Sequence, residues 1–402
     1  MSSIEEMIAE FCPHGVEYKC LGDIGSICMC KRIMKNQTSV DGDVPFYKIG
    51  TFGGKADAYI SIELFEEYKE KYSYPKIGDI LISAAGTIGR TIIFDGEPSY
   101  FQDSNIVWID NDEKLVMNKF LYYYYQLQPW QVSTGGTIAR LYNDNIARAR
   151  LPVPPLEVQR EIVHVLDSFT LLTAELTAEL TARKKQYEFY RNKMLTFDTN
   201  VTRKRLGEIF DFRNGLSKGK EFFGSGTPFI RYTDVYNHRS LRKEDITALV
   251  DCTPSELEKL RVSRGDVLFT RTSETAEDVG WSSVMLDDIG DCVFNGFTIK
   301  ATPKTDDLLP EYCAYCFATD SFRNYVTTHC AFTTRASLTG NTIAEYQIAI
   351  PSIDEQQRIA NVLGNFEAIC SDLNIGLPAE IAARQKQYEY YRDKLLSFEE
   401  VK

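Results

Sequence analysis

The chain has 402 residues, of which 44% are hydrophobic and 25% charged, which is ordinary for a globular protein and long enough for two or more domains. Its net charge of −12 argues against a protein that coats nucleic acid without preference, but it leaves room for a local basic surface. We find no apolar stretch of about 18 residues that could cross a membrane. The segment Met1–Glu6 does not resemble a signal peptide, so we expect a cytoplasmic protein without a membrane partner.

The first part of the chain predicts a globular unit of short strands and a few helices. Residues 80–82, 91–94 and 106–108 are apolar and rich in β-branched side chains, and glycine and aspartate turns bound them. The aromatic segment 119–127 could form a strand. We predict a helix there, because its counterpart at 310–319 begins with a proline typical of helix starts.

A long helix follows. From Leu156 to Phe197 the apolar residues recur in steps of three and four, which predicts a coiled-coil seam along a helix of roughly 60 Å. Two adjacent copies of Thr-Ala-Glu-Leu lie within it, at 173–176 and 177–180. Each four-residue copy turns a helix by about 400° and lengthens it by about 6 Å, so the buried face is nearly preserved.

The sequence repeats itself at about half the chain length. Residues 182–197 reappear as 383–398, with eleven of sixteen positions identical. Shorter matches pair Leu21–Ile24 with Leu206–Ile209, Pro45–Ile49 with Pro228–Tyr232, Lys76–Ser83 with Ser263–Thr270, and Pro154–Phe169 with Pro351–Phe366. One unit has therefore been duplicated. We predict a globular domain at 1–153, a long helix at 154–199, a second globular domain at 200–350 and a second long helix at 351–402.

The two helical segments differ at one place. The second carries Gly376-Leu-Pro378, and a proline inside a helix kinks or breaks it, so we predict that this helix breaks and restarts there. Because a globular domain separates the two segments, we expect them to pair antiparallel, in a pseudo-two-fold α+β protein. The alternative is a pair of separate dimerisation helices.

Signatures of catalysis are missing. Gly215–Glu221 is one residue short of a phosphate-binding loop, and Phe222–Gly226 imitates a methyltransferase cofactor loop but leads into a strand. The only Cys-x-x-Cys pair, Cys313 and Cys316, lacks a second pair of metal ligands, so we interpret it as core packing. The four histidines show no pairing that indicates a metal or a triad. We predict no catalytic, cofactor-binding or metal-binding residue in this chain.

The repeated motifs point to a known family. Pro154–Ile162, the Thr-Ala-Glu-Leu tandem and the repeated Arg-x-x-Gln-Tyr-Glu-x-Tyr-Arg helix resemble the specificity subunits of type I restriction–modification enzymes, in particular the subfamily with Thr-Ala-Glu-Leu spacer repeats. The match covers essentially the whole chain, and the layout of a variable globular unit followed by a repeated helix is itself typical of that family.

The resemblance implies a non-catalytic subunit that recognises double-stranded DNA. Two target-recognition domains would each read one part of a split site, and the antiparallel coiled coil would hold them apart. Two methylation subunits would bind S-adenosylmethionine and modify adenine, and motor and nuclease subunits would use ATP and Mg. The number of Thr-Ala-Glu-Leu copies would set the length of the DNA spacer.

The best candidates for DNA contact are polar residues in or beside glycine-flanked loops. Small residues there allow close approach of the backbone, and arginine can bind phosphate or the edge of guanine. The candidates are Lys48, Ser83, Thr87, Arg90, Thr137, Arg140, Arg231, Tyr232, Thr270, Arg271, Thr272, Thr334 and Arg335.

Two other functions remain open from the sequence. The chain could be a structural or regulatory DNA-binding protein without enzyme partners, which co-purification with a methylation subunit would decide. It could also be a stand-alone methyltransferase, which the missing cofactor and base-pocket motifs disfavour.

Overall fold

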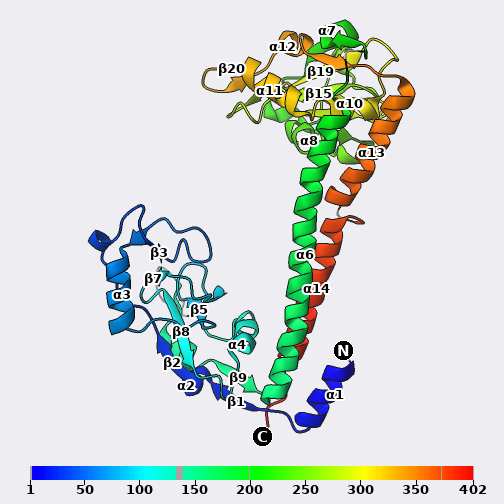
Figure 1. Ribbon diagram of the computed structural model, residues 1–402. Coiled ribbons are helices and arrows are strands. Elements are labelled where there is room, and N and C mark those ends of the chain that lie inside the picture. Colours follow the sequence, from blue (N-terminus) through cyan, green and yellow to red (C-terminus); the bar gives the residue numbers. More distant parts are fainter. Residues whose placement is uncertain (1, 133–138, 199, 373, 402) are drawn as a thin grey trace. The chain divides into compact units, whose positions relative to one another are not determined.

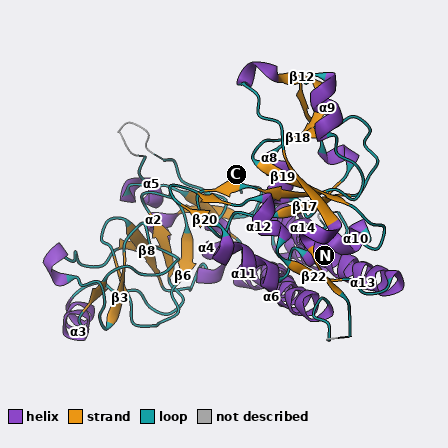
Figure 2. Cartoon of the chain, turned by 90° about the horizontal axis from the view of Figure 1, so that it is seen from above, coloured by secondary structure: helices purple, strands orange, loops and turns teal. Residues whose placement is uncertain are grey.

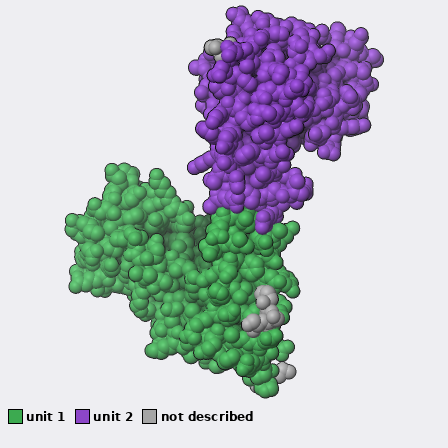
Figure 3. Space-filling model, turned by 45° about the vertical axis from the view of Figure 1, so that its right-hand side comes forward, with its two compact units in different colours: residues 1–176, 381–402 green, residues 177–380 purple. Residues whose placement is uncertain are grey.

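The computed structural model describes residues 2–132, 139–198, 200–372 and 374–401. The chain divides into two compact units, coloured separately in Figure 3. Unit 1 comprises residues 1–176 and 381–402, and unit 2 comprises residues 177–380. The first boundary falls inside helix α6 (Leu156–Met194), between the two copies of Thr-Ala-Glu-Leu.

In the described part of unit 1, a four-stranded antiparallel sheet has the order β2-β8-β5-β6, and a three-stranded sheet has the order β4-β3-β7 (Figure 1). Strands β1 and β9 form a separate antiparallel ribbon. The strands are β1 (Glu17–Cys20), β2 (Gly25–Cys28), β3 (Val44–Tyr47), β4 (Tyr59–Ile60), β5 (Ile80–Ser83), β6 (Thr91–Ile93), β7 (Tyr100–Phe101), β8 (Ile106–Asn111) and β9 (Arg150–Val153). The helices are α1 (Ser2–Phe11), α2 (Leu21–Ile24), α3 (Ile62–Lys71), α4 (Asn118–Tyr125), α5 (Asn143–Ala147) and the 3-10 turn η1 (Lys35–Gln37).

Strand β8 is buried on both faces, which explains its continuous apolar sequence. Ile106 and Trp108 face one core, with side chains from the three-stranded sheet and α3. Val107 and Ile109 face the other core, which α4 and the start of α6 complete. The three strands expected at 80–82, 91–94 and 106–108 are thus confirmed as β5, β6 and β8.

Unit 2 repeats this plan with additions. Its larger sheet has the order β11-β19-β15-β17-β13, and smaller sheets have the orders β14-β12-β18, β16-β21-β20 and β10-β22. The strands are β10 (Arg203–Arg205), β11 (Phe210–Asn214), β12 (Phe223–Ile230), β13 (Ser240–Leu241), β14 (Ala248–Val250), β15 (Val267–Thr270), β16 (Thr272–Ser273), β17 (Ser282–Met285), β18 (Val293–Phe294), β19 (Thr298–Pro303), β20 (Ala331–Phe332), β21 (Ala336–Ser337) and β22 (Gln347–Ala349). Figure 2 shows β12 and β18 beside α9.

The helices of unit 2 include α13, the first part of the second helical segment. They are α7 (Leu206–Ile209), α8 (Tyr232–Asn237), α9 (Pro254–Leu260), α10 (Pro310–Cys316), α11 (Asp320–His329), α12 (Gly340–Ala344), α13 (Ile353–Ser371), and the 3-10 turns η2 (Lys220–Phe222) and η3 (Lys243–Asp245). The predicted helices at 119–127 and 310–319 are confirmed as α4 and α10. The glycines of Phe222–Gly226 lie in strand β12 and open no helix, as expected.

The second helical segment breaks where the proline predicted it. Helix α13 ends at Ser371 and helix α14 (Leu377–Leu395) begins one residue before Pro378. Proline is tolerated in a first turn because the N–H groups there have no partner within the helix.

Each unit contains an antiparallel helix pair. In unit 1 the ring of Phe169 on α6 stacks on Tyr391 near the end of α14, with centroids 5.5 Å apart. In unit 2 Phe366 on α13 packs against Tyr190 near the end of α6, with centroids 5.8 Å apart. These are equivalent residues of the repeat, so each unit joins the start of one helical segment to the end of the other. The predicted antiparallel pairing is confirmed within each unit, and the alternative of two separate helices is wrong.

A buried glutamine fixes each globular domain to its helix. The amide of Gln159 accepts a hydrogen bond from Met117 N (2.9 Å) and donates to Leu115 O and Pro154 O (2.8 Å each). The amide of Gln356 makes the equivalent bonds, from Leu309 N (2.8 Å) and to Asp307 O (2.8 Å) and Pro351 O (2.9 Å). Both glutamines are 0% exposed. One side chain therefore satisfies three backbone groups that would otherwise be buried without partners.

The paired cysteines belong to the core of unit 2. Cys313 and Cys316 lie on α10 and are buried, as are their counterparts Leu121 and Tyr124 on α4. Burial raises the pKa of the Cys316 thiol to about 12 and raises that of Cys313 as well. Among the described residues we find no cluster of histidine, cysteine and acidic side chains that could hold a metal ion. The burial of both thiols in the core of unit 2 confirms the interpretation as core packing.

We predict that Gln356→Met lowers the free energy of unfolding of unit 2 by about 2–4 kcal/mol, because it leaves three buried backbone groups without partners. Urea denaturation would measure the loss, and hydrogen exchange would show faster exchange of the Leu309 amide. Gln357→Met is the matched control, since Gln357 is exposed and its side chain donates to the neighbouring Asn361. Equal stability of the two variants would contradict the role given to Gln356.

We also predict that Cys313 and Cys316 resist alkylation at pH 8 in the folded protein, because raised pKa values keep both thiols protonated and burial excludes the reagent. Cys20, which is partly exposed, should react under the same conditions. Mass spectrometry after labelling with iodoacetamide, before and after denaturation, measures both. Rapid native labelling of either buried thiol would overturn the assignment.

Candidate nucleic-acid interface

A repeated Gly-Asp turn leads into the central strand of each domain. Gly78 and Gly265 adopt φ values of 91° and 89°, which glycine reaches without strain. The following aspartates, Asp79 and Asp266, accept hydrogen bonds from Lys76 N and Ser263 N at 2.8 Å. The turns that precede β5 and β15 therefore have the same conformation, and equivalent loops follow the carboxyl ends of these two strands.

Ser83 and Thr270, two of the predicted DNA contacts, end these two strands. Both side chains are buried. The Ser83 hydroxyl accepts a hydrogen bond from Arg90 N, and the Thr270 hydroxyl accepts one from Trp281 N, each at 2.9 Å. Their hydroxyls thus close the loops that follow, and their role as direct DNA contacts stays a prediction.

The loops closed by these hydroxyls carry different side chains in the two units. Arg90 in unit 1 and Trp281 in unit 2 occupy the same place, since each pairs through its backbone with the end of the preceding strand. Arg90 is exposed but its NH1 donates to Phe52 O at 2.7 Å. Trp281 is 39% exposed and packs on the guanidinium of Arg323, 4.5 Å from the ring centroid. Thr87 is exposed within the first loop.

Two of the predicted residues in unit 1 line the same cavity, together with residues that the sequence analysis missed. This cavity, which we call the basic hollow, has a volume of about 580 Å³, within the usual range for ligand sites of about 300–1,000 Å³. It is formed by side chains of the loop 32–38, the end of β3, Ala58, the loop 102–105 and Arg140. Four basic side chains line it, Arg32, Lys35, Lys48 and Arg140, against one acidic side chain, Asp103.

The loop 102–105 holds the arginines of the basic hollow in place. Arg140 NH2 donates to Ser104 O at 2.8 Å and to Asn105 Oδ1 at 3.3 Å. Arg32 Nε donates to Asp103 Oδ2 at 2.9 Å. Ser104 adopts φ 59°, a left-handed conformation that turns its carbonyl toward Arg140. Two hydrogen bonds thus orient the Arg140 guanidinium, whereas Arg32 is 67% exposed and held by a single ion pair.

The equivalent positions Lys48 and Arg231 are both paired with aspartates. Lys48 Nζ lies 2.8 Å from Asp57 Oδ1, at the rim of the basic hollow. Arg231 bonds to Asp234 through Nε and NH2, and this side-chain hydrogen bond raises the pKa of Arg231. The side chains of Lys48 and Asp57 are both exposed, so we expect Lys48 to exchange its carboxylate for a phosphate at small cost. Asp234 is buried, so the same exchange at Arg231 would leave a buried carboxylate without its partner and would cost more.

In unit 2 the predicted residues lie at the start of α8, between β15 and β16 with the strand ends beside it, and in the turn between β20 and β21. Arg271 joins three neighbouring segments, since its N–H donates to Phe297 O and its carbonyl accepts from Leu338 N. Tyr232 is partly buried and stacks on Tyr236. The other members, partly or fully exposed, are Thr272, Thr334 and Arg335. The remaining candidate, Thr137, lies outside the described residues.

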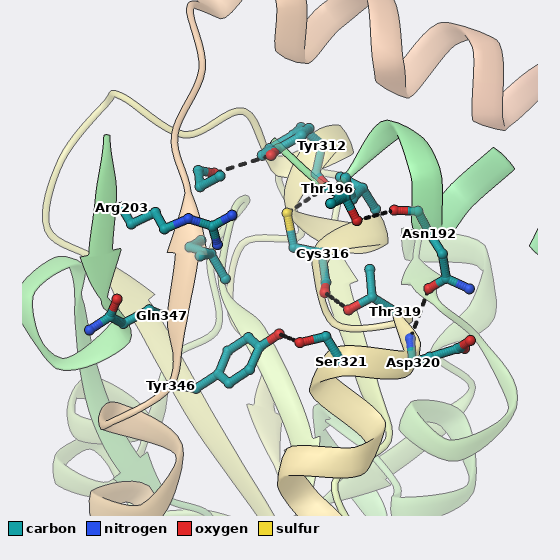
Figure 4. A pocket seen from close by; sticks show the side chains of 13 residues that line it. Asn192, Thr196, Arg203, Tyr312, Cys316, Thr319, Asp320, Ser321, Tyr346 and Gln347 are labelled. Atoms are coloured by element: carbon teal, nitrogen blue, oxygen red, sulfur yellow. Dashed lines mark hydrogen bonds between the residues drawn. The ribbon is translucent and has the colours of Figure 1, made fainter. Parts of the chain in front are cut away.

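A second cavity in unit 2, of about 350 Å³, has a different character (Figure 4). Its polar groups bond mainly to one another: Tyr346 to Ser321 at 3.1 Å, and Asp320 N to Asn192 at 2.9 Å. Arg203 is the basic side chain in its lining and Asp320 is the acidic one. This cavity therefore lacks the excess of positive charge that marks the basic hollow.

The structure adds several candidate residues that the sequence did not indicate. In unit 1 they are Arg32, Lys35, Gln102 and Asn105, and in unit 2 they are Trp281 and Phe297. The internal repeat could have indicated Lys35, because Lys35 and Lys220 each begin the 3-10 turn that follows the first strand of the larger sheet. The others become visible only once the loops are brought together.

No helix in the part of the chain that the structure describes is long and apolar enough to span a bilayer.

Comparisons with known proteins agree with the structure. A 62% identical candidate type I restriction enzyme specificity subunit from Haemophilus influenzae matches over 44% of this chain, which spans 47% of that relative's length. The EcoR124I/EcoR124II specificity subunit of Escherichia coli is 30% identical over 81% of this chain and 82% of its own.

Solved structures share the fold. A chain from a study of assembly and conformational transition in a type I restriction–modification system gives a TM-score of 0.63, at 16% identity, over 96% of this chain and 98% of that one. The specificity subunit from M. genitalium gives 0.51 at 13% identity, over 95% and 96%. The family model for the type I restriction modification DNA specificity domain matches residues 13–183 and 199–383. The chain therefore belongs to the family of type I restriction–modification specificity subunits.

Proposed function

We propose that this chain recognises a two-part DNA site, with one target-recognition domain in each unit reading one part. The observation that carries the proposal is that both units build the same hydrogen-bonded framework and place different polar side chains on it. Arg90 N bonds to Ser83 and Trp281 N to Thr270 through equivalent hydroxyls, yet one exposed side chain is a guanidinium and the other an indole. Equivalent backbone positions that carry different exposed side chains are suited to binding two different DNA half-sites.

We further propose that the helix pairs set the spacer between the half-sites. Helix α6 contributes to both units, and the boundary between the units falls between its two Thr-Ala-Glu-Leu copies. Because the two boundaries of the units lie at 176–177 and 380–381, the length of helix around them can change while the contacts inside each unit persist. Assignment to the subfamily with Thr-Ala-Glu-Leu spacers is part of this proposal.

The proposed partners follow from the family. We propose that two methylation subunits bind to this chain and modify adenine using S-adenosylmethionine, and that motor and nuclease subunits join them with ATP and Mg. The chain would act in the cytoplasm, where it has access to genomic DNA. A stand-alone methyltransferase would need a cofactor loop between a strand and a helix, whereas Phe222–Gly226 leads into β12. A DNA-binding protein without enzyme partners would purify alone.

Deleting Thr177–Leu180 should shorten the preferred spacer between the half-sites, because it removes about 6 Å of α6. Methylation-sensitive sequencing of a host that carries the variant would measure the spacer. The control is Thr177→Ala, which keeps the length of the helix and should keep the spacer. An unchanged spacer at full activity in the deletion variant would refute the proposal.

Arg271→Ala should relax or weaken recognition of one half-site only, by about tenfold, because Arg271 lies at the meeting point of the unit 2 loops. Binding to duplexes that vary one half-site at a time would measure this effect. Arg264→Ala provides the matched control, because Arg264 lies in the turn at the opposite end of β15. An equal loss for both half-sites would contradict the assignment.

A further inference from the structure

The segments that form the basic hollow of unit 1 and the corresponding segments of unit 2 are joined by equivalent backbone hydrogen bonds. Gln102 N donates to Tyr47 O, as Asn295 N does to Ile230 O. Leu141 N donates to Ala84 O, as Leu338 N does to Arg271 O. These bonds make the two sites comparable position by position, without any appeal to sequence similarity in the loops.

One basic position is the same in both units. Lys35 and Lys220 each begin a 3-10 turn, in η1 and η2. Both side chains are exposed, and neither has an ion-pair partner within the described ranges. An exposed lysine that stands at the equivalent position in both units is suited to a contact that is the same in both half-sites. The phosphate backbone is the part of DNA that is the same at every site.

Two other positions differ completely between the units. Arg140 precedes Leu141, and Ser337 precedes Leu338. Asn105 precedes the first residue of β8, whereas Phe297, 58% exposed, precedes the first residue of β19. A guanidinium and an amide in unit 1 are thus replaced by a hydroxyl and a phenyl ring in unit 2. Side chains that differ on a common frame are suited to the part of DNA that differs, the base edges.

The pair in unit 1 offers hydrogen-bond donors. Arg140 has no acceptor, and its NH2 is bonded to Ser104 O and to Asn105 Oδ1. The Asn105 oxygen is thus engaged, and Asn105 Nδ2 and Arg140 NH1 remain without partners among the described residues. In the major groove guanine presents two neighbouring acceptors, N7 and O6, whereas adenine presents one acceptor and one donor.

We propose that Arg140, oriented by Asn105 and Ser104, reads a guanine in the half-site bound by unit 1, and that Lys35 and Lys220 bind phosphates in their respective half-sites. This inference rests on the proposed function, and it adds the residues and the base that determine specificity in unit 1.

The test uses the full chain in the complex with which it purifies, and duplex DNA with a randomised recognition region. Wild-type protein should select a two-part site with a guanine at one position of the unit 1 half-site. Arg140→Lys keeps the charge but loses the planar guanidinium, and should reduce discrimination at that position by about tenfold while the other half-site is unchanged. Lys35→Ala and Lys220→Ala should keep the selected sequence and lower the slope of log affinity against log salt by about one.

Lys114→Ala is the charge-matched control, because Lys114 is exposed and lies beyond the opposite end of β8 from the loop 102–105. Its salt slope should remain that of the wild type. A wild-type complex that selects no sequence would overturn the proposed function itself. A selected site that Arg140→Lys leaves unchanged, or an equal salt effect in Lys114→Ala, would overturn this inference alone. Thermal unfolding of each variant checks that it is folded.

Discussion

The architecture depends on one buried amide in each unit. Gln159 and Gln356 stand in the first turn of α6 and α13, where each bonds to the segment before α4 or α10 and to the proline carbonyl before its own helix. A helix can transmit spacing only if the domain at its end cannot tilt against it. Three hydrogen bonds from one side chain fix that junction in a way that apolar packing, which has no direction, does not.

In each unit, the groups that hold the loops in place differ from the side chains that we propose to contact DNA. The Gly-Asp turns, the closing hydroxyls of Ser83 and Thr270 and the backbone bonds of Leu141 and Leu338 recur in both units. The side chains at the loop tips do not recur. Backbone hydrogen bonds and buried side chains hold these loops in place. The exposed side chains of the loops can therefore be substituted, because they contribute little to the core.

The sequence predicted what is repeated and periodic, and it failed where loops meet. The helix at 156–194, the break at Pro378 and strands β5, β6 and β8 followed from periodicity and from proline geometry. Ser83 and Thr270 were predicted as contacts because they are polar, and their burial, which depends on residues several positions later in the chain, was not predicted. Asn105 and Arg140 approach each other across 35 positions, and no local pattern reveals such a pair.

The composition of the units also has a consequence for synthesis on the ribosome. The core of unit 1 includes Tyr388 and Leu395 of α14, and Val16 bonds to Glu399 near the end of the chain. Unit 2 is one continuous segment, so it can fold as soon as it emerges. Unit 1 must wait, with part of α6 and α4 uncovered, until residues 381–402 have been made. The unit whose translation begins first is therefore the unit completed last.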